Sequence, residues 1–222
     1  MGFRTGAVLT SVAFLYGVLF VASVYDFPLI YGEFTDEKGL IAEKFYLSVF
    51  QGPRAVSALL HGMMLLGVLG CSAKLHAWSE LAKYFDGSSL ALLVGAICMY
   101  AAVIVPNLRL LADPANVNLL NNSSIRTERD QFIKNQGGTP PGLYTEPLTN
   151  DERFSALMII GATNTINMVL LAGVVLLQAV ASYIEAEEKK EAQKQRVEAA
   201  EALRQQIKGK AAVDAPETKK DK

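Results

Sequence analysis

The fold is decided by an uncharged run of about 30 residues near the carboxyl end of the chain, Phe154–Tyr183, which reads FSALMIIGATNTINMVLLAGVVLLQAVASY. A helix rises 1.5 Å per residue, so about 20 apolar residues cover the roughly 30 Å hydrocarbon core of a bilayer. The run is longer than one crossing needs. It therefore predicts a span at about residues 156–183 that tilts or continues as a helix beyond the membrane.

Three further uncharged runs precede this one, at about residues 5–25, 55–73 and 90–108. In hydrocarbon the backbone can be satisfied only within its own helix, so we expect all four runs to be α-helical. The sequence thus predicts an all-α integral membrane protein with four transmembrane helices in residues 1–183. A charged tail follows in residues 184–222. A cleaved signal peptide is an alternative for the first run, but the run exceeds the 7–15 apolar residues typical of such peptides.

Composition and motifs exclude several classes of protein. The net charge of −1 gives no reason to expect a nucleic-acid partner. Cys71 and Cys98 are the two cysteines and form no CxxC pair, so neither a disulfide-stapled domain nor a thiol-redox site is expected. The sequence has no His or Cys cluster, phosphate-binding glycine loop or nucleophile motif. We therefore expect no metal, no cofactor and no enzymatic activity.

The topology is indicated by charge and by sequons. Four spans place both termini on one side, and the basic residues that follow the last span favour the cytosol: Lys189, Lys190, Lys194 and Arg196. Asn121 and Asn122 each begin an N-x-S sequon, and a glycan there would require the third loop, residues 109–153, to be luminal. Both signals predict cytosolic termini.

The tail carries a second localisation signal. Lys219 and Lys220 are fourth and third from the end, which matches the dilysine signal that the retrograde coat reads to return membrane proteins to the endoplasmic reticulum (ER). Before it, the tail is rich in helix formers to about Lys208 and becomes disorder-prone after Gly209. We expect a helical and then disordered cytosolic tail in an ER membrane protein.

A few polar residues inside the spans are candidate contacts. His61 is the one His, Asp, Glu, Lys or Arg in the four runs. It suggests a proton relay or a partner contact, but we favour a neutral imidazole bonded to a neighbouring helix, because no other span offers it a charged partner. In the fourth span Asn164, Thr165 and Asn167 should face other helices, of this chain or of another protein. Gly161 forms a small-xxx-small pair with Thr165, which favours close packing.

Several segments together resemble a known family. They are Val24-Tyr25-Asp26 after the first span, Ala96-Ile97-Cys98 in the third, and Asn164-Thr165-Ile166-Asn167 followed by residues 172–178 in the fourth. With the four-span layout and charged tail, they resemble the fungal secretory packaging chaperones for amino acid permeases. The resemblance implies an ER membrane chaperone rather than an enzyme. It would assist the folding of polytopic permeases and present them to COPII coat components through its tail.

Two other functions remain open at this point. A structural tetraspan of the claudin or tetraspanin kind is disfavoured, because such proteins rely on disulfides and the loops at residues 26–54 and 109–153 contain no cysteine. A small membrane enzyme or proton-coupled carrier built around His61 is the other alternative.

Overall fold

The computed structural model describes residues 3–33, 35–76 and 82–213, and no strand occurs among them. The predicted all-helical fold with four long apolar helices is confirmed. The apolar helices occupy Phe3–Ile30, Arg54–Leu75, Lys83–Ala112 and Asn150–Glu201. The chain divides into two compact units, residues 1–178 and 179–222.

The elements follow one another as α1 (Phe3–Ile30), α2 (Asp36–Phe50), α3 (Arg54–Leu75), the π-helical segment η1 (Ala82–Asp86), α4 (Gly87–Met99), the π-helical segment η2 (Tyr100–Ile104), α5 (Val105–Ala112), α6 (Val117–Asn121), α7 (Ser124–Asn135) and α8 (Asn150–Val213). The segment η2 ends two residues before Pro106, which lacks the amide hydrogen that a regular α-helix would use there. α8 continues as helix past Gly209, where the sequence predicted the start of disorder.

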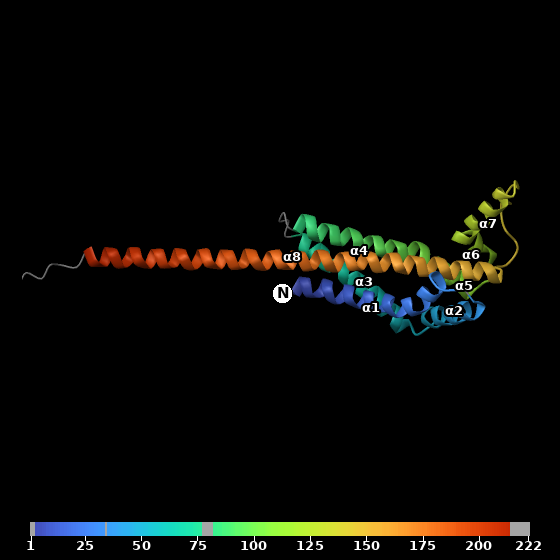
Figure 1. Cartoon of the computed structure of the whole chain (residues 1–222), viewed down its shortest axis with the longest axis horizontal. Helices are drawn as coiled ribbons and strands as arrows, with labels where there is room; N and C mark the ends of the chain where they lie inside the picture. Colours follow the sequence, from blue (N-terminus) through green and yellow to red (C-terminus); the bar gives the residue numbers. More distant parts are fainter. Residues whose placement is uncertain (1–2, 34, 77–81, 214–222) are drawn as a thin grey trace, which may run out of the picture. The chain divides into compact units, whose positions relative to one another are not determined.

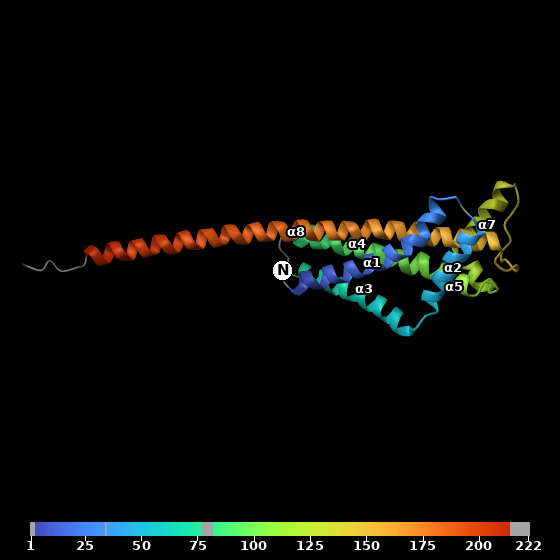
Figure 2. The same ribbon diagram turned by 60° about the horizontal axis from the view of Figure 1, so that its bottom comes forward.

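Within the first unit the long helices lie side by side and alternate in direction (Figure 1). The shorter helices α2, α5, α6 and α7 gather at the end opposite the amino terminus, and the turned view agrees (Figure 2). At the amino-terminal end, Arg4 Nη1 donates a 2.9 Å hydrogen bond to the carbonyl oxygen of Ala73. The start of α1 therefore lies beside the end of α3, as an up-and-down arrangement requires.

The helices α1 and α3 approach each other closely because α3 carries glycine where they meet. A Cβ atom added at Gly67 would lie 2.6 Å from Ser11 Oγ, and one at Gly70 would lie 2.7 Å from a methyl group of Val8. Ser11 Oγ also donates a hydrogen bond to the carbonyl oxygen of Met63. Small residues at a helix contact allow this close packing inside a membrane.

The first predicted loop, residues 26–54, contains a helix, α2. This helix was not predicted from the sequence, because it contains no long apolar run. Thr35 caps it by accepting a hydrogen bond from the Lys38 amide, and Asp36 and Glu37 occupy the first turn, where carboxylates are favoured by the helix dipole. A Cβ atom at Gly39 would lie 2.4 Å from the Phe154 ring. Glycine at this position thus allows α2 to pack against the start of α8.

The buried apolar side chains of the first unit form two separate clusters. The distal cluster, at the end that holds the short helices, consists of Leu29, Ala42, Tyr46, Ile104, Leu108, Leu110, Leu111, Leu120, Ile125, Leu148, Ala156, Leu157 and Ile160. The proximal cluster, toward the amino-terminal end, consists of Val8, Val12, Leu15, Cys71, Leu93, Ala96, Leu171 and Val174.

Candidate functional site

Three buried polar side chains from three helices form the Asp26 cluster, which consists of Asp26, Tyr46 and Asn164. Tyr46 on α2 donates its hydroxyl hydrogen to Asp26 Oδ1. Asn164 Nδ2 on α8 lies 3.0 Å from Asp26 Oδ2 and 2.7 Å from the Tyr46 hydroxyl oxygen. Each carboxylate oxygen of Asp26 thereby receives a donor, which offsets the cost of burying the group. The cluster joins α1, α2 and α8.

An apolar cavity of about 360 Å³ lies between the distal and proximal clusters and is lined by residues of both, such as Leu108 and Leu171. Its walls come from α1, α2, α3, α4, η2, α5 and α8. Its few polar lining residues are Tyr46, Ser57, Tyr100, Asn164 and Asn167. The cavity therefore interrupts the packing of the bundle at the level of the Asp26 cluster.

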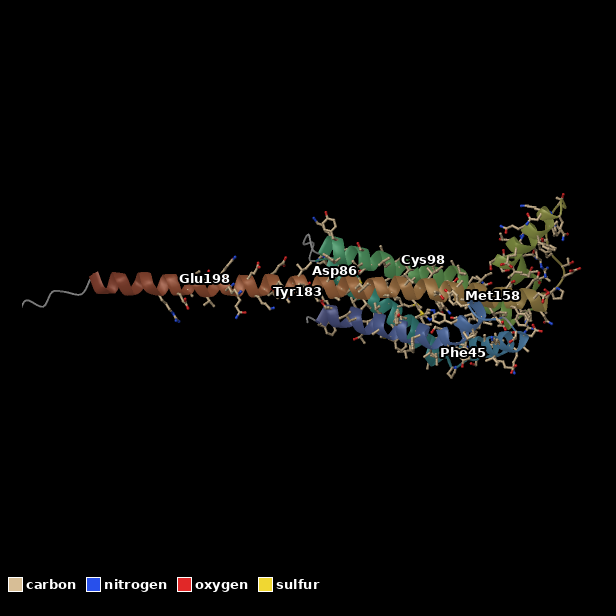
Figure 3. All side chains as sticks on the ribbon, in the orientation of Figure 1. Phe45, Asp86, Cys98, Met158, Tyr183 and Glu198 are labelled. Atoms are coloured by element: carbon tan, nitrogen blue, oxygen red, sulfur yellow. The ribbon has the colours of Figure 1, made fainter. Side chains whose placement is uncertain are left out.

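The cavity opens onto the surface of the first unit. The lining residues at its rim are exposed apolar side chains, Val18 and Val21 on α1, Val49 on α2 and Val56 on α3. An opening with an apolar rim can admit another apolar surface without the desolvation of polar groups. Figure 3 shows Phe45, another lining residue, on α2 beside α1.

Asn167 lines the same cavity and is only 4% exposed. Among the side chains that the structure describes, two buried polar atoms have no hydrogen-bond partner, Arg153 Nε and Asn167 Oδ1. Arg153 is already paired with Glu43 through another guanidinium nitrogen. A buried acceptor left without a donor costs about 1–3 kcal/mol, and hydrocarbon cannot supply a donor.

A second buried polar group, the Lys74 cluster, consists of Lys74 on α3, Asp86 in η1, Ser89 on α4 and Gln178 on α8. Gln178 follows Asn164 of the Asp26 cluster by fourteen residues on α8, which at 1.5 Å per residue is about 21 Å. Lys74 Nζ lies 2.9 Å from Asp86 Oδ1 and 2.7 Å from Gln178 Oε1. Gln178 Nε2 donates to Asp86 Oδ1 at 2.9 Å and to Ser89 Oγ at 3.0 Å. Figure 3 shows Asp86 toward the amino-terminal end and Met158 toward the other.

The third loop is held together by hydrogen bonds. Asn121 Nδ2 donates to the carbonyl oxygens of Val117 and Tyr144, and its Oδ1 accepts from the Tyr144 amide. Arg129 pairs with Glu152 through two nitrogens. These hydrogen bonds to Glu152 raise the pKa of the Arg129 guanidinium above its ordinary value. The segment between α7 and α8 is therefore bonded to α6 through Tyr144, and α7 is bonded to the start of α8 through Glu152.

The predicted contact residues lie in different environments. Asn164 and Asn167 both line the cavity. Gly161 packs against α1, since a Cβ atom added there would lie 3.1 Å from Ile30 and 3.2 Å from Asp26. Thr165 instead donates to the carbonyl oxygen of Gly161 in its own helix at 3.0 Å.

His61 is exposed, and its Nδ1 lies 2.6 Å from the carbonyl oxygen of Ser57 on its own helix, not on a neighbouring one as expected. A carbonyl oxygen can only accept, so Nδ1 carries the proton. The ring of Tyr100, in η2, lies edge-on to the imidazole at a centroid distance of 5.8 Å.

The two sequons differ in accessibility. Asn121 is buried, whereas Asn122 is exposed and donates to the carbonyl oxygen of Asn118. The candidate retrieval residues Lys219 and Lys220 lie outside the described residues.

Sequence reasoning missed Asp26, Lys74 and Asp86 as buried groups because it ended each span at the nearest charge. The helices extend past those charges, so the candidate spans contain Asp26, Lys74 and Asp86 besides His61. The signal that could have revealed them is Gln178, an amide far along the fourth apolar run that needs a polar partner on another helix.

These features define a helical membrane protein whose spans are joined by buried polar clusters and interrupted by an apolar cavity. Among the described residues, no group of His, Cys, Asp and Glu could hold a metal ion. The model of the SHR3 chaperone family, described as ER membrane protein SH3, matches residues 1–219. The chain belongs to this family. It is an ER membrane chaperone for the packaging of amino acid permeases, and it is not an enzyme.

A comparison with curated proteins finds no match, and neither does a comparison with solved structures. The family match confirms the resemblance read from the sequence and the location in the ER membrane. It excludes the surface tetraspan and the His61-dependent enzyme or carrier as functions of this chain.

Proposed function

We propose that the cavity between the distal and proximal clusters is where this chaperone holds a newly inserted permease span. The observation that carries this proposal is the opening of the cavity between exposed apolar side chains, with Val56 at its rim and Asn167 at its wall. Lipid tails are as apolar as the spans, so association in the bilayer depends on packing and interhelical hydrogen bonds. A preformed gap in the bundle offers both.

Weak contacts suit such a role. Polar contacts between helices contribute about 0.6–1.7 kcal/mol each, so a span held by a few of them can leave again when its own partners have been made. The Asp26 and Lys74 clusters are bonded within the chain. They therefore hold the bundle together while the cavity remains available to a client.

The proposal is tested by photocrosslinking in microsomes that synthesise a permease. A photoreactive residue at Val56, on the cavity rim, should label the permease. The same residue at Leu69, which is exposed on α3 away from the cavity lining, should label it much less. Leu60→Trp, which fills the cavity, should abolish labelling from Val56, whereas Leu59→Trp, on the exposed face, should preserve it. Equal labelling in both tryptophan variants would refute the proposal.

We also propose that both termini lie in the cytosol and that the loops at residues 26–54 and 109–153 lie in the lumen. The alternating helices and the basic residues after the fourth span support this orientation. A protease added to intact microsomes should remove a tag at either terminus. Protection of either tag would reverse the assignment.

For the coats, we propose that the charged tail, residues 184–222, engages COPII components and that Lys219 and Lys220 engage the retrograde coat. The tail carries 10 basic and 9 acidic residues from Glu185 onward, a composition suited to a solvated binding segment. Lys219→Ser with Lys220→Ser should let the chaperone escape the ER, which fractionation would detect. Complete ER retention of the double variant would rule out the retrieval signal.

A further inference from the structure

The cavity of the first unit presents a nearly apolar wall to whatever occupies it. Two of its polar lining residues, Tyr46 and Asn164, are bonded to Asp26 and to each other, and the unpaired oxygen of Asn167 is enclosed by protein atoms. The rim residue Val56 and much of the wall belong to helices that are long and apolar enough to cross a membrane. In a bilayer such a space is filled by hydrocarbon, because an empty apolar void forfeits the contacts of the atoms that line it.

The volume of the cavity suits one acyl chain. An apolar cavity of about 150 Å³ holds one benzene molecule, which has six carbon atoms. By that ratio the cavity, at about 360 Å³, holds roughly 14 carbon atoms. This is most of one fatty acyl chain and far less than a whole lipid with two chains. The headgroup and the second chain would therefore remain outside.

A basic residue lies where the headgroup of such a lipid would be. Three residues line the cavity from one face of α3, namely Ser57, Leu60 and Met64. Arg54 lies three residues before Ser57, so it belongs to the same face. Arg54 is exposed and forms no ion pair with any residue that the structure describes, and Glu43, the acidic residue nearest before it in the sequence, is paired with Arg153. The Arg54 guanidinium can thus bind a phosphate, which it can do through two parallel hydrogen bonds.

The depth of the cavity matches one leaflet of a bilayer. Arg54 begins α3, and the lining residue Met64 lies ten residues further on, about 15 Å along the helix. The hydrocarbon of one leaflet is also about 15 Å thick, half of the roughly 30 Å core. A phosphate bound at Arg54 therefore allows the acyl chain below it to reach Met64.

We infer that the cavity and Arg54 together bind a membrane phospholipid, with one acyl chain in the cavity and the phosphate on the guanidinium. The inference goes beyond the proposed function and does not depend on it. Where the cavity receives a permease span, that span displaces the lipid, and lipid fills the space again when the span leaves.

The test uses the full chain reconstituted in phosphatidylcholine vesicles without a permease. A small fraction of the phosphatidylcholine carries a photoreactive diazirine in one acyl chain, and peptide mass spectrometry locates the label. Labelling at Met64 should exceed labelling at Leu69, which is exposed on α3 outside the cavity lining and reports contact with bulk lipid. Leu60→Trp, which fills the cavity, should reduce the label at Met64 to the level at Leu69, whereas Leu59→Trp should preserve it.

The contact with the phosphate is tested by removing its charge. Arg54→Gln should lower the label at Met64 about 5-fold, the effect of one basic residue at a lipid headgroup. Lys134→Gln, which removes an exposed charge from α7, is the matched control and should leave the label unchanged. A diacylglycerol with the same diazirine chain lacks the phosphate, so it should label Met64 equally in Arg54→Gln and in the unaltered chain.

Equal labelling of Met64 and Leu69 in the unaltered chain would overturn the inference, as would an unchanged phosphatidylcholine label in Arg54→Gln. An equal loss of both probes in Arg54→Gln would also overturn it, because the substitution would then have altered the cavity and not a phosphate contact. No permease is present in these vesicles. The proposed function is tested separately by crosslinking from Val56, so the failure of one can be told from the failure of the other.

Discussion

At the scale of single residues, the Asp26 cluster shows how a carboxylate can be tolerated within the apolar part of this chain. Its oxygens accept from the Tyr46 hydroxyl and the Asn164 amide, and all three side chains are buried. The substitution Tyr46→Phe removes the hydroxyl group that donates a hydrogen bond to Asp26 Oδ1. We expect a loss of about 1–3 kcal/mol in the free energy of unfolding, the usual cost of a buried group deprived of its partner.

Thermal unfolding of the detergent-solubilised protein would measure this loss. Tyr31→Phe is the control, because Tyr31 lies largely exposed after α1 and the substitution removes the same hydroxyl group. A melting temperature of Tyr46→Phe equal to that of the control would show that the hydroxyl contributes nothing to stability.

A second prediction at this scale concerns the two sequons. Both amide hydrogens of Asn121 have acceptors within the folded loop, the carbonyl oxygens of Val117 and Tyr144, so a glycan there would break these bonds. Asn122 is exposed. We expect glycosylation at Asn122 in the folded chaperone. Glycosidase digestion should shift the gel mobility of the unaltered chain and of Asn121→Gln but not of Asn122→Gln. The reverse pattern would contradict the structure of this loop.

At the scale of secondary-structure elements, the contact between α1 and α3 depends on glycine at one position of α3 and not at another. A Cβ atom at Gly67 would lie 2.6 Å from Ser11 Oγ and 2.9 Å from Leu93, whereas one at Gly62 meets nothing within 4 Å. Gly67→Ala should therefore force the helices apart and destabilise the protein by about 1–3 kcal/mol, the range for overpacked sites. Gly62→Ala, one and a half turns earlier, should not destabilise it. Similar melting temperatures for the two variants would argue against this contact.

The helices themselves were largely predictable from the sequence, and their ends were not. Long uncharged runs indicate spans because hydrocarbon excludes charge, but this criterion ends each span at the first charge it meets. Asp26 and Lys74 are charged and yet helical and buried, because Asn164 and Gln178 on α8 supply their partners. Such pairing across more than 100 residues leaves no periodic pattern in a single sequence. α2 was missed for a related reason, since it is too short and too charged to be recognised as a span.

The candidate site was predictable only in part. The polar residues of the fourth span were recognised as needing helix contacts, but nothing local distinguishes Asn164, whose amide is bonded, from Asn167, whose oxygen is not. The difference arises because Tyr46 and Asp26 reach one of them and not the other. The cavity is likewise a product of how seven elements meet.

At the scale of the whole molecule, the division of the chain into two units predicts a division of labour. The Asp26 cluster, the Lys74 cluster and the cavity all lie within residues 1–178, the first unit. The second unit contributes the charged part of α8, where exposed pairs such as Glu185 with Lys189 and Glu187 with Lys190 occur. Such surface pairs stabilise the bundle little, about 0.3–0.5 kcal/mol each. Shielding of permeases should therefore belong to the first unit, and their export should depend on the second.

A chain truncated after Tyr183 tests this division. In cells that lack the full-length chaperone, it should keep permeases from aggregating, as native gel electrophoresis would show, while the permeases remain in the ER. A version with the last four residues, Lys219–Lys220–Asp221–Lys222, appended after Tyr183 controls for the lost retrieval signal. It should restore ER residence of the chaperone without restoring permease export. Permease aggregation equal to that in cells with no chaperone would show that the tail is needed for shielding as well, and the two activities could not then be assigned to separate units.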